Sequence, residues 1–180
     1  MGGVEKYTYY MCDFETTVYE GQTNTEVWAS ACVEFGTEDV KIFHSIEQQY
    51  QYFICLQRNI VCYYHNLKFD GAFWINYILT ELNYRPATLY YEENETGVHT
   101  EFERKNQLKN GEFLYSISNR GQWYSITIKD NDYTIEIRDS MKLLPFSVER
   151  IGKSFKTKHK KLEMEYTGLR YAGCGARQRA

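Results

Sequence analysis

The stretch Cys12-Asp13-Phe14-Glu15-Thr16-Thr17 places two acidic residues at the end of a hydrophobic segment that begins at Tyr7. The segment has the composition of a β-strand, and side chains two positions apart on a strand point to the same face. We therefore expect Asp13 and Glu15 to point into one space. Two carboxylates aimed together repel each other unless something neutralises them, and a divalent cation is the usual partner.

A second segment, about fifty residues later, supplies a third acid. It reads Tyr64-His65-Asn66-Leu67-Lys68-Phe69-Asp70-Gly71-Ala72-Phe73. Asp-x-Glu on a first strand, followed by Asn-x-x-x-Asp entering a helix, is the layout of a two-metal phosphodiesterase, in which two cations flank the scissile phosphate. Asp-x-Glu alone has an ordinary interpretation as a solvated strand end. The second segment makes the catalytic interpretation stronger.

Together the two segments resemble the first and second exonuclease motifs of family B DNA polymerases, especially the protein-primed branch found in small bacteriophages. Three further strings strengthen the resemblance: Gly121-Gln122-Trp123-Tyr124, Asp139-Ser140-Met141-Lys142-Leu143-Leu144-Pro145-Phe146 and Lys161-Leu162-Glu163-Met164-Glu165-Tyr166. The resemblance runs from about residue 7 to residue 166 and covers only the proofreading domain. It implies a ribonuclease-H-like (DnaQ-like) α/β fold, a mixed sheet flanked by helices.

The resemblance also implies roles for individual residues. The carboxylates of Asp13, Glu15 and Asp70 would hold Mg²⁺ or Mn²⁺, and the catalytic positions also include Lys161 and Tyr166. The positions that hold a single-stranded DNA 3′ end match Thr16, Asn66, Phe69, Ser140 and Met141. At the position of His65 the family contacts the 3′ end or a priming protein, although a histidine here also fits a purely structural role.

The partners implied are a single-stranded DNA 3′ end, a priming terminal protein and a polymerase domain, with the chain itself expected to be a monomer. No apolar run is long enough to span a membrane, and there is no signal peptide. The five cysteines are odd in number and lack Cys-x-x-Cys spacing. Reduced and mostly buried thiols are therefore expected, in the cytoplasm of a bacterial host or phage-infected cell.

The net charge of −3 conceals an uneven distribution. Residues 1–141 carry 11 Lys and Arg against 21 Asp and Glu, whereas residues 142–180 carry 10 against 3. The basic end has two interpretations that the sequence leaves open. It is a solvated surface or tail, or an arm that faces phosphates beside an acidic metal site.

The pattern of apolar residues predicts the order of the elements. We expect a helix to open at Ser45, which begins a capping box, and another to open at Ser147. Strands are predicted at 7–14, 26–35, 39–43, 60–64, 112–119, 123–129 and 133–138, and helices at 45–57, 70–82 and 148–155. The first strand is expected to be central. Residues 92–111 are predicted to form an insertion, as a loop or an extended hairpin.

The end of the chain departs from the family pattern. The third exonuclease motif, Tyr-x-x-x-Asp, has no counterpart, because residues 167–180 contain neither Asp nor Glu. We expect residues 1–166 to form the exonuclease domain and residues 167–180 an irregular tail. Weak activity follows, with Asp139 the first candidate for a substitute acid. The alternatives are an inactive fragment that binds single-stranded DNA ends or a terminal protein, and a structural fragment.

Overall fold

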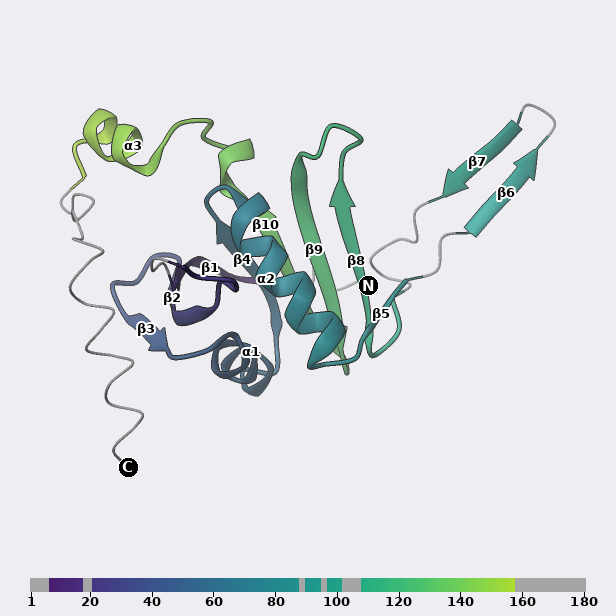
Figure 1. The fold of residues 1–180 in the computed structure, drawn as a ribbon, viewed down its shortest axis with the longest axis horizontal. Helices are drawn as coiled ribbons and strands as arrows, with labels where there is room; N and C mark the ends of the chain where they lie inside the picture. Colours follow the sequence, from purple (N-terminus) through teal and green to yellow (C-terminus); the bar gives the residue numbers. More distant parts are fainter. Residues whose placement is uncertain (1–6, 18–20, 88–89, 95–96, 102–107, 158–180) are drawn as a thin grey trace, which may run out of the picture.

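The computed structural model describes residues 7–17, 21–87, 90–94, 97–101 and 108–157, and side chains are described outside 90–101. Its body is an eight-stranded mixed sheet (Figure 1). The strand order across the sheet is β3 (Val40–Phe43), β2 (Val27–Glu34), β1 (Tyr7–Thr16), β4 (Asn59–Tyr64), β10 (Tyr133–Asp139), β9 (Trp123–Asp130), β8 (Glu112–Ile117) and β5 (Arg85–Pro86). β1, β4 and β10 run parallel to one another, and β5 runs parallel to β8.

The predicted mixed sheet is confirmed, with one adjustment to its centre. β1 is an interior strand between β2 and β4, while β4 and β10 form the middle of the sheet. β1 also continues to Thr16, two residues beyond the predicted end, so that Glu15 as well as Asp13 lies within the strand. The two acids are therefore held by ladder hydrogen bonds on a rigid element.

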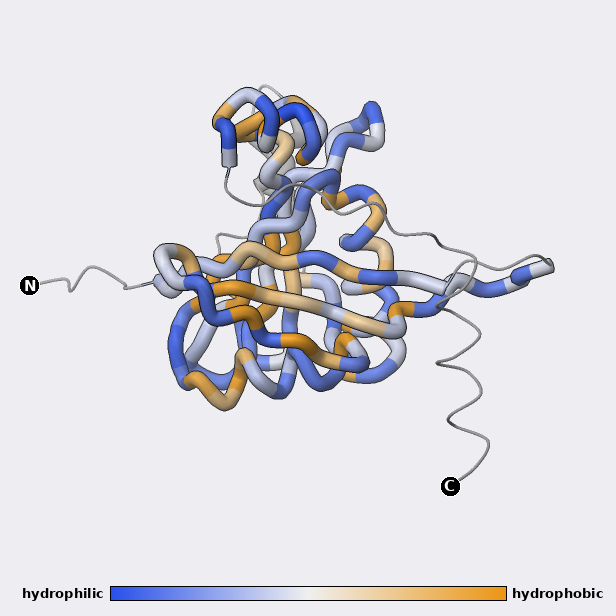
Figure 2. The backbone as a smooth tube through the Cα atoms, turned by 90° about the vertical axis from the view of Figure 1, so that its left-hand side faces the viewer, coloured by the Kyte–Doolittle hydropathy of each residue, from blue (hydrophilic) through white to orange (hydrophobic). Residues whose placement is uncertain are grey.

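Two helices, α1 (Ile46–Cys55) and α2 (Leu67–Thr80), cover one face of the sheet. The core forms where their aromatic side chains meet the alternate, buried residues of the strands. The Tyr10 ring packs 5.3 Å from that of Phe53, and the Phe14 ring lies 5.9 Å from that of Trp74. In Figure 2 the most hydrophobic stretches accordingly run along the strands in the body of the domain.

Serine caps begin two of the helices, as predicted. The Ser45 side chain accepts a hydrogen bond from the Gln48 N–H at the start of α1. Ser147 accepts one from the Arg150 N–H at the start of α3 (Val148–Phe155). Each side-chain oxygen thus takes up one backbone donor that the first helical turn leaves free.

The predicted start of α2 was wrong. The helix begins at Leu67, three residues before Asp70, and follows directly on Asn66, whose φ of 68° is left-handed. Asn adopts this conformation more readily than most residues, which allows the chain to turn sharply from β4 into the helix. Asp70 therefore occupies the first helical turn, which points its carboxylate back toward the end of β1.

The region predicted as a loop or hairpin contains a hairpin, β6 (Tyr90–Asn94) paired antiparallel with β7 (Gly97–Glu101). The hairpin projects from the body, and α3 lies near the opposite side of the molecule (Figure 1). A short 3-10 turn, η2 (Ser140–Lys142), connects β10 toward α3. Both projecting elements therefore leave the central sheet intact.

The predicted burial of the cysteines is confirmed for three of them and wrong for one. Cys12, Cys32 and Cys62 are free and buried as expected, but Cys55 is free and exposed. It is the last residue of α1, two positions after the buried Phe53, and so lies on the side of the helix away from the core. Cys174 lies outside the described residues. None of the described helices is long and apolar enough to cross a membrane.

Candidate active site

The carboxyl ends of the three parallel strands bring most of the described candidate residues to one edge of the sheet. β1 ends with Asp13 and Glu15 just before Thr16, β4 is followed by His65 and Asn66, and β10 ends at Asp139 before Ser140. In open α/β sheets this edge is where ligands bind. Segments about fifty and seventy residues apart in the chain thus become neighbours.

Asp13 and Glu15 share one face of β1, as the sequence predicts. In the ladder with β2, Asp13 stands opposite Ala31 and Glu15 opposite Ala29. The one residue between them, Phe14, is only 5% exposed and packs against Trp74 of α2, whereas Asp13 is exposed. The two carboxylates therefore lie on the face that α1 and α2 do not cover, at the end of the strand.

Asp70 is the buried acid of the site, with 4% of its surface exposed. Burial raises the pKa of its carboxyl to about 7, and the nearby charge of Asp13 adds to this rise. The backbone N–H groups of Asp70 itself and of Phe14 lower the pKa, and the charge of Asp139 raises it further. Asp70 thus reaches the backbone of β1 between Asp13 and Glu15, near enough to Asp13 for the two charges to interact.

Asp139 connects three elements at this edge. Its Oδ1 accepts hydrogen bonds from the backbone N–H of Asn66, at 3.1 Å, and of Met141, at 3.0 Å. Its Oδ2 lies 3.8 Å from Lys142 Nζ. The carboxylate therefore holds the left-handed turn before α2 against the turn after β10. The sequence predicts Asp139 only as a substitute for the missing acid. Its position at the end of a predicted strand was the signal that could have placed it in the site.

His65 and Ser140, both predicted DNA-contacting residues, contact each other. Ser140 Oγ donates to the Tyr64 carbonyl oxygen at 3.1 Å and lies 3.1 Å from His65 Nδ1. Because the hydroxyl has one proton, which it gives to the carbonyl, His65 Nδ1 is the donor in the second bond. His65 Nε2 is buried with no hydrogen-bond partner in the described part of the chain.

The remaining predicted residues differ in accessibility. Phe69 is 50% exposed, with its ring at 5.4 Å from that of Phe73, so its free face can meet a ligand. Thr16 is only 8% exposed and points to the helix-covered side of β1. Lys161 and Tyr166 lie outside the described residues, so their predicted roles stay predictions.

A cation site requires that the oxygen atoms of several side chains converge on one point. Among the described residues, no three Asp, Glu, His or Cys side chains converge closely enough to hold one metal ion. Mg²⁺, however, is commonly held by one or two carboxylates, with waters and substrate phosphates completing its shell. The pair formed by Asp13 and Asp70 fits that kind of site. The three-carboxylate site that includes Glu15 stays a prediction.

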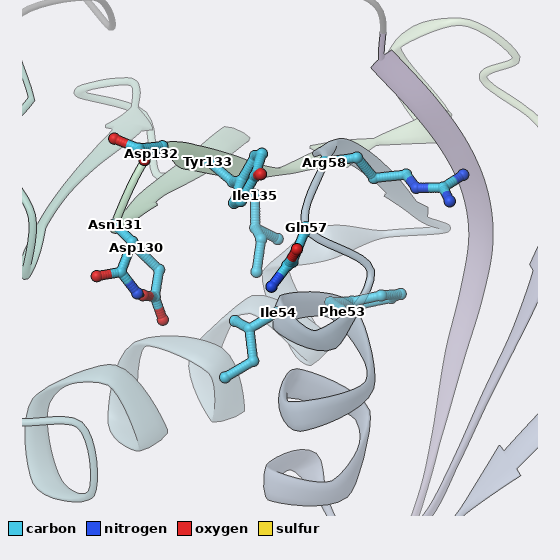
Figure 3. Close-up of a pocket in the computed structure, with 9 residues that line it drawn as sticks. All are labelled: Phe53, Ile54, Gln57, Arg58, Asp130, Asn131, Asp132, Tyr133 and Ile135. Atoms are coloured by element: carbon cyan, nitrogen blue, oxygen red, sulfur yellow. The ribbon is translucent and has the colours of Figure 1, made fainter.

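Of the hollows in the described part of the chain, one adjoins the site and another lies at the opposite end of the sheet. A groove of about 470 Å³ adjoins the site, lined by His65 and Ser140 together with apolar side chains that include Tyr9 and Met11. A second hollow, of about 360 Å³, is shown in Figure 3 and includes Asp130 and Asp132. It lies where β9 turns into β10, at the end of the sheet away from Asp13, so its acids do not contribute to the site.

The sheet has acids at the carboxyl ends of its parallel strands. The sequence of the chain is in addition clearly similar to that of a known protein family. The family model described as DNA polymerase type B, organellar and viral, matches residues 52–176. The chain therefore belongs to this family of DNA polymerases.

Among its relatives are the DNA polymerases of Bacillus phage B103 and Bacillus phage phi29, each 33% identical over 171 residues, which is 91% of this chain. The DNA polymerase of Streptococcus phage Cp-1 is 30% identical over 161 residues, 82% of this chain. The chain spans 26% of the length of the two Bacillus phage proteins and 23% of that from Cp-1.

Solved structures of a DNA polymerase from this family match the fold of the chain. An orthorhombic crystal form of phi29 DNA polymerase matches with a TM-score of 0.67 and 29% identity, covering 89% of this chain and 25% of that one. The structure of phi29 DNA polymerase complexed with single-stranded DNA matches with a TM-score of 0.67 and 28% identity, covering 89% and 26%. The predicted ribonuclease-H-like fold is confirmed.

The buried acid predicts a dependence of stability on pH. The pKa of Asp70 in the folded state, about 7, is above its ordinary value of 3.8. The stability that its protonation provides is therefore fully present below pH 4 and is lost as the pH rises through 7. In metal-free buffer, Asp70→Asn should raise the free energy of unfolding at pH 8 by roughly 2–4 kcal/mol. Urea unfolding from pH 4 to 8 measures this difference.

The matched control is Asp39→Asn, because Asp39 is an exposed acid 2.6 Å from Lys41. Its stability curve should stay parallel to that of the wild type. If the curve of Asp70→Asn also runs parallel to the wild type at every pH, burial does not raise the pKa of Asp70.

Proposed function

We propose that this chain is the 3′→5′ exonuclease domain of a phage-type DNA polymerase and hydrolyses the 3′ ends of single-stranded DNA. The observation that carries the proposal is that the buried Asp70, in the first turn of α2, lies near enough to Asp13 at the end of β1 for their charges to interact. In water, two like charges would separate, so their enforced proximity is a feature of a site that binds a cation.

The solved relatives support the choice of substrate. Structures of phi29 DNA polymerase have been determined in complex with single-stranded DNA and, separately, with primer-template DNA. In this chain the groups around the acids suit an unpaired strand. Phe69 offers a half-exposed ring for stacking on a base, and the exposed Asn66 offers an amide.

Each of these residues would have a different role in hydrolysis. Asp13 and Asp70, with Glu15, would hold Mg²⁺ or Mn²⁺, which when bound polarises the phosphoryl oxygen and lowers the pKa of a coordinated water. Asp139 keeps Asn66 and the start of α2 in place through its two backbone hydrogen bonds. His65 contacts Ser140 in the wall of the adjoining groove and would hold that wall in place. Lys161 and Tyr166 complete the proposal from the resemblance.

A binding function without turnover is the second candidate. The observation that favours it is that no three candidate ligand side chains converge on one point within the described residues. A domain of this kind would still hold a single-stranded 3′ end or a priming terminal protein. The two candidates differ in whether DNA bound at the acids is shortened, which the predictions below separate.

The acid pair should bind Mn²⁺. Binding to the folded state alone raises the free energy of unfolding, by about 2.7 kcal/mol at one hundred times the dissociation constant. Asp13→Ala should remove this gain, whereas Asp39→Ala, which changes an exposed acid elsewhere, should keep it. Thermal unfolding with and without Mn²⁺ gives the comparison. Equal stabilisation of the wild type and Asp13→Ala would contradict the site.

A 5′-labelled single-stranded oligonucleotide tests the reaction. With Mg²⁺ or Mn²⁺ it should be shortened progressively from its 3′ end, slowly in this chain, and Asp70→Ala should lower the rate at least about a hundredfold because metal-assisted activation is lost. Gel electrophoresis resolves the products. Binding without shortening would favour the second candidate, and neither binding nor shortening would overturn both.

Phe69 should contribute to binding single-stranded DNA. Loss of one stacked base costs about 1–3 kcal/mol, so Phe69→Ala should weaken binding by roughly five- to 150-fold. Tyr115→Ala is the control, because Tyr115 of β8 is 52% exposed and three strands separate β8 from β1. Fluorescence anisotropy at two salt concentrations measures both variants. Unchanged affinity in Phe69→Ala would show that its ring serves only packing.

A further inference from the structure

One buried amide connects α1 to the two strands that flank β1. Gln49 is fully buried, and its Oε1 accepts hydrogen bonds from Ser30 Oγ of β2, at 2.5 Å, and from the Tyr64 hydroxyl of β4, at 3.1 Å. β2 and β4 are the neighbours of β1 on its two sides. The Ser30–Gln49–Tyr64 network therefore spans β1 behind the strand.

The network encloses the residue that separates the two acids of β1. Phe14 stands opposite Ser30 in the ladder, and its ring lies 5.0 Å from that of Tyr64. The same ring lies 5.9 Å from Trp74 of α2. Because Phe14 lies between Asp13 and Glu15, a shift of β1 at Phe14 moves both carboxylates relative to α2.

A polar network at this place is a poor choice for stability alone. Ser30, Gln49 and Tyr64 are all at most 2% exposed, and Gln49 Nε2 has no hydrogen-bond partner in the described part of the chain. Burying an unsatisfied donor costs free energy, and apolar side chains of similar shape would avoid that cost. What directed hydrogen bonds add over apolar packing is a fixed mutual orientation of the groups they join.

We propose that Gln49 is a positioning residue, which through Ser30 and Tyr64 sets the distance between the acids of β1 and Asp70 of α2. This inference rests on the proposed function, because it assigns the network to the geometry of that site. Gln49 itself lies beneath the sheet and touches neither DNA nor a metal ion.

The test separates positioning from folding. Gln49→Met leaves two buried hydroxyls without their acceptor, so it should lower both the melting temperature and the affinity for Mn²⁺. The triple variant Ser30→Ala, Gln49→Met, Tyr64→Phe removes all three polar groups and should regain the melting temperature. Its Mn²⁺ affinity should stay roughly tenfold below that of the wild type, the lower limit for residues that orient metal ligands.

A matched control removes a buried hydroxyl from the other end of the sheet. Tyr50 is 2% exposed, and its hydroxyl donates to Asp130 in the turn between β9 and β10. Tyr50→Phe should lower the melting temperature while the Mn²⁺ affinity remains that of the wild type. A triple variant that regains both the melting temperature and the Mn²⁺ affinity would overturn the inference.

A metal-free readout keeps the inference distinct from the proposed function. Nuclear Overhauser effects between the rings of Phe14, Tyr64 and Trp74 report the position of β1 against α2. They should change in Gln49→Met and in the triple variant, but not in Tyr50→Phe. Unchanged effects in both network variants overturn the inference, even if the wild type binds Mn²⁺. A wild type that binds no Mn²⁺ counts against the proposed function, and the ring contacts still decide the inference.

Discussion

The parallel pairing of β1 with β4 and of β4 with β10 is the constraint on which the rest of the structure depends. Parallel neighbours cannot be joined by a tight turn, so the chain must cross a face of the sheet between them. Here α1 precedes β4 and α2 follows it, and both helices pack on one face. The same pairing aligns the carboxyl ends of three strands, and this alignment creates the site.

The site itself is unfavourable by elementary electrostatics. Asp70 is buried, and the charges of Asp13 and Asp139 both oppose its ionisation. The arrangement persists because neighbouring contacts fix it. Asp139 is held by two backbone N–H groups and lies near Lys142, and α2 packs so closely that an added Cβ on Gly71 would be 2.8 Å from the Trp123 ring. A buried acid whose pKa is raised by burial and by neighbouring acids is characteristic of functional sites.

The elements could be predicted from local pattern, and the errors have local causes. Ser147 correctly predicted both the start and the extent of α3, since its capping bond involves residues three apart. The start of α2 was missed because it depends on Asn66, whose left-handed backbone is stabilised by Asp139 from a distant strand. Cys55 was expected to be buried because the apolar segment around it was assigned to the core as a whole, whereas the helix turns Cys55 away from the face that Tyr50 and Phe53 bury.

The sequence by itself determined that Asp13 and Glu15 share a face, because alternation along a strand is a property of the backbone. It also determined, through its motifs, the family and the fold. Only the tertiary structure decided that Asp139 joins the site, that His65 bonds Ser140, and that Gln49 links the strands on either side of β1. These contacts join residues 15 to 75 positions apart, and the strand order that brings them together comes from the packing of the whole sheet.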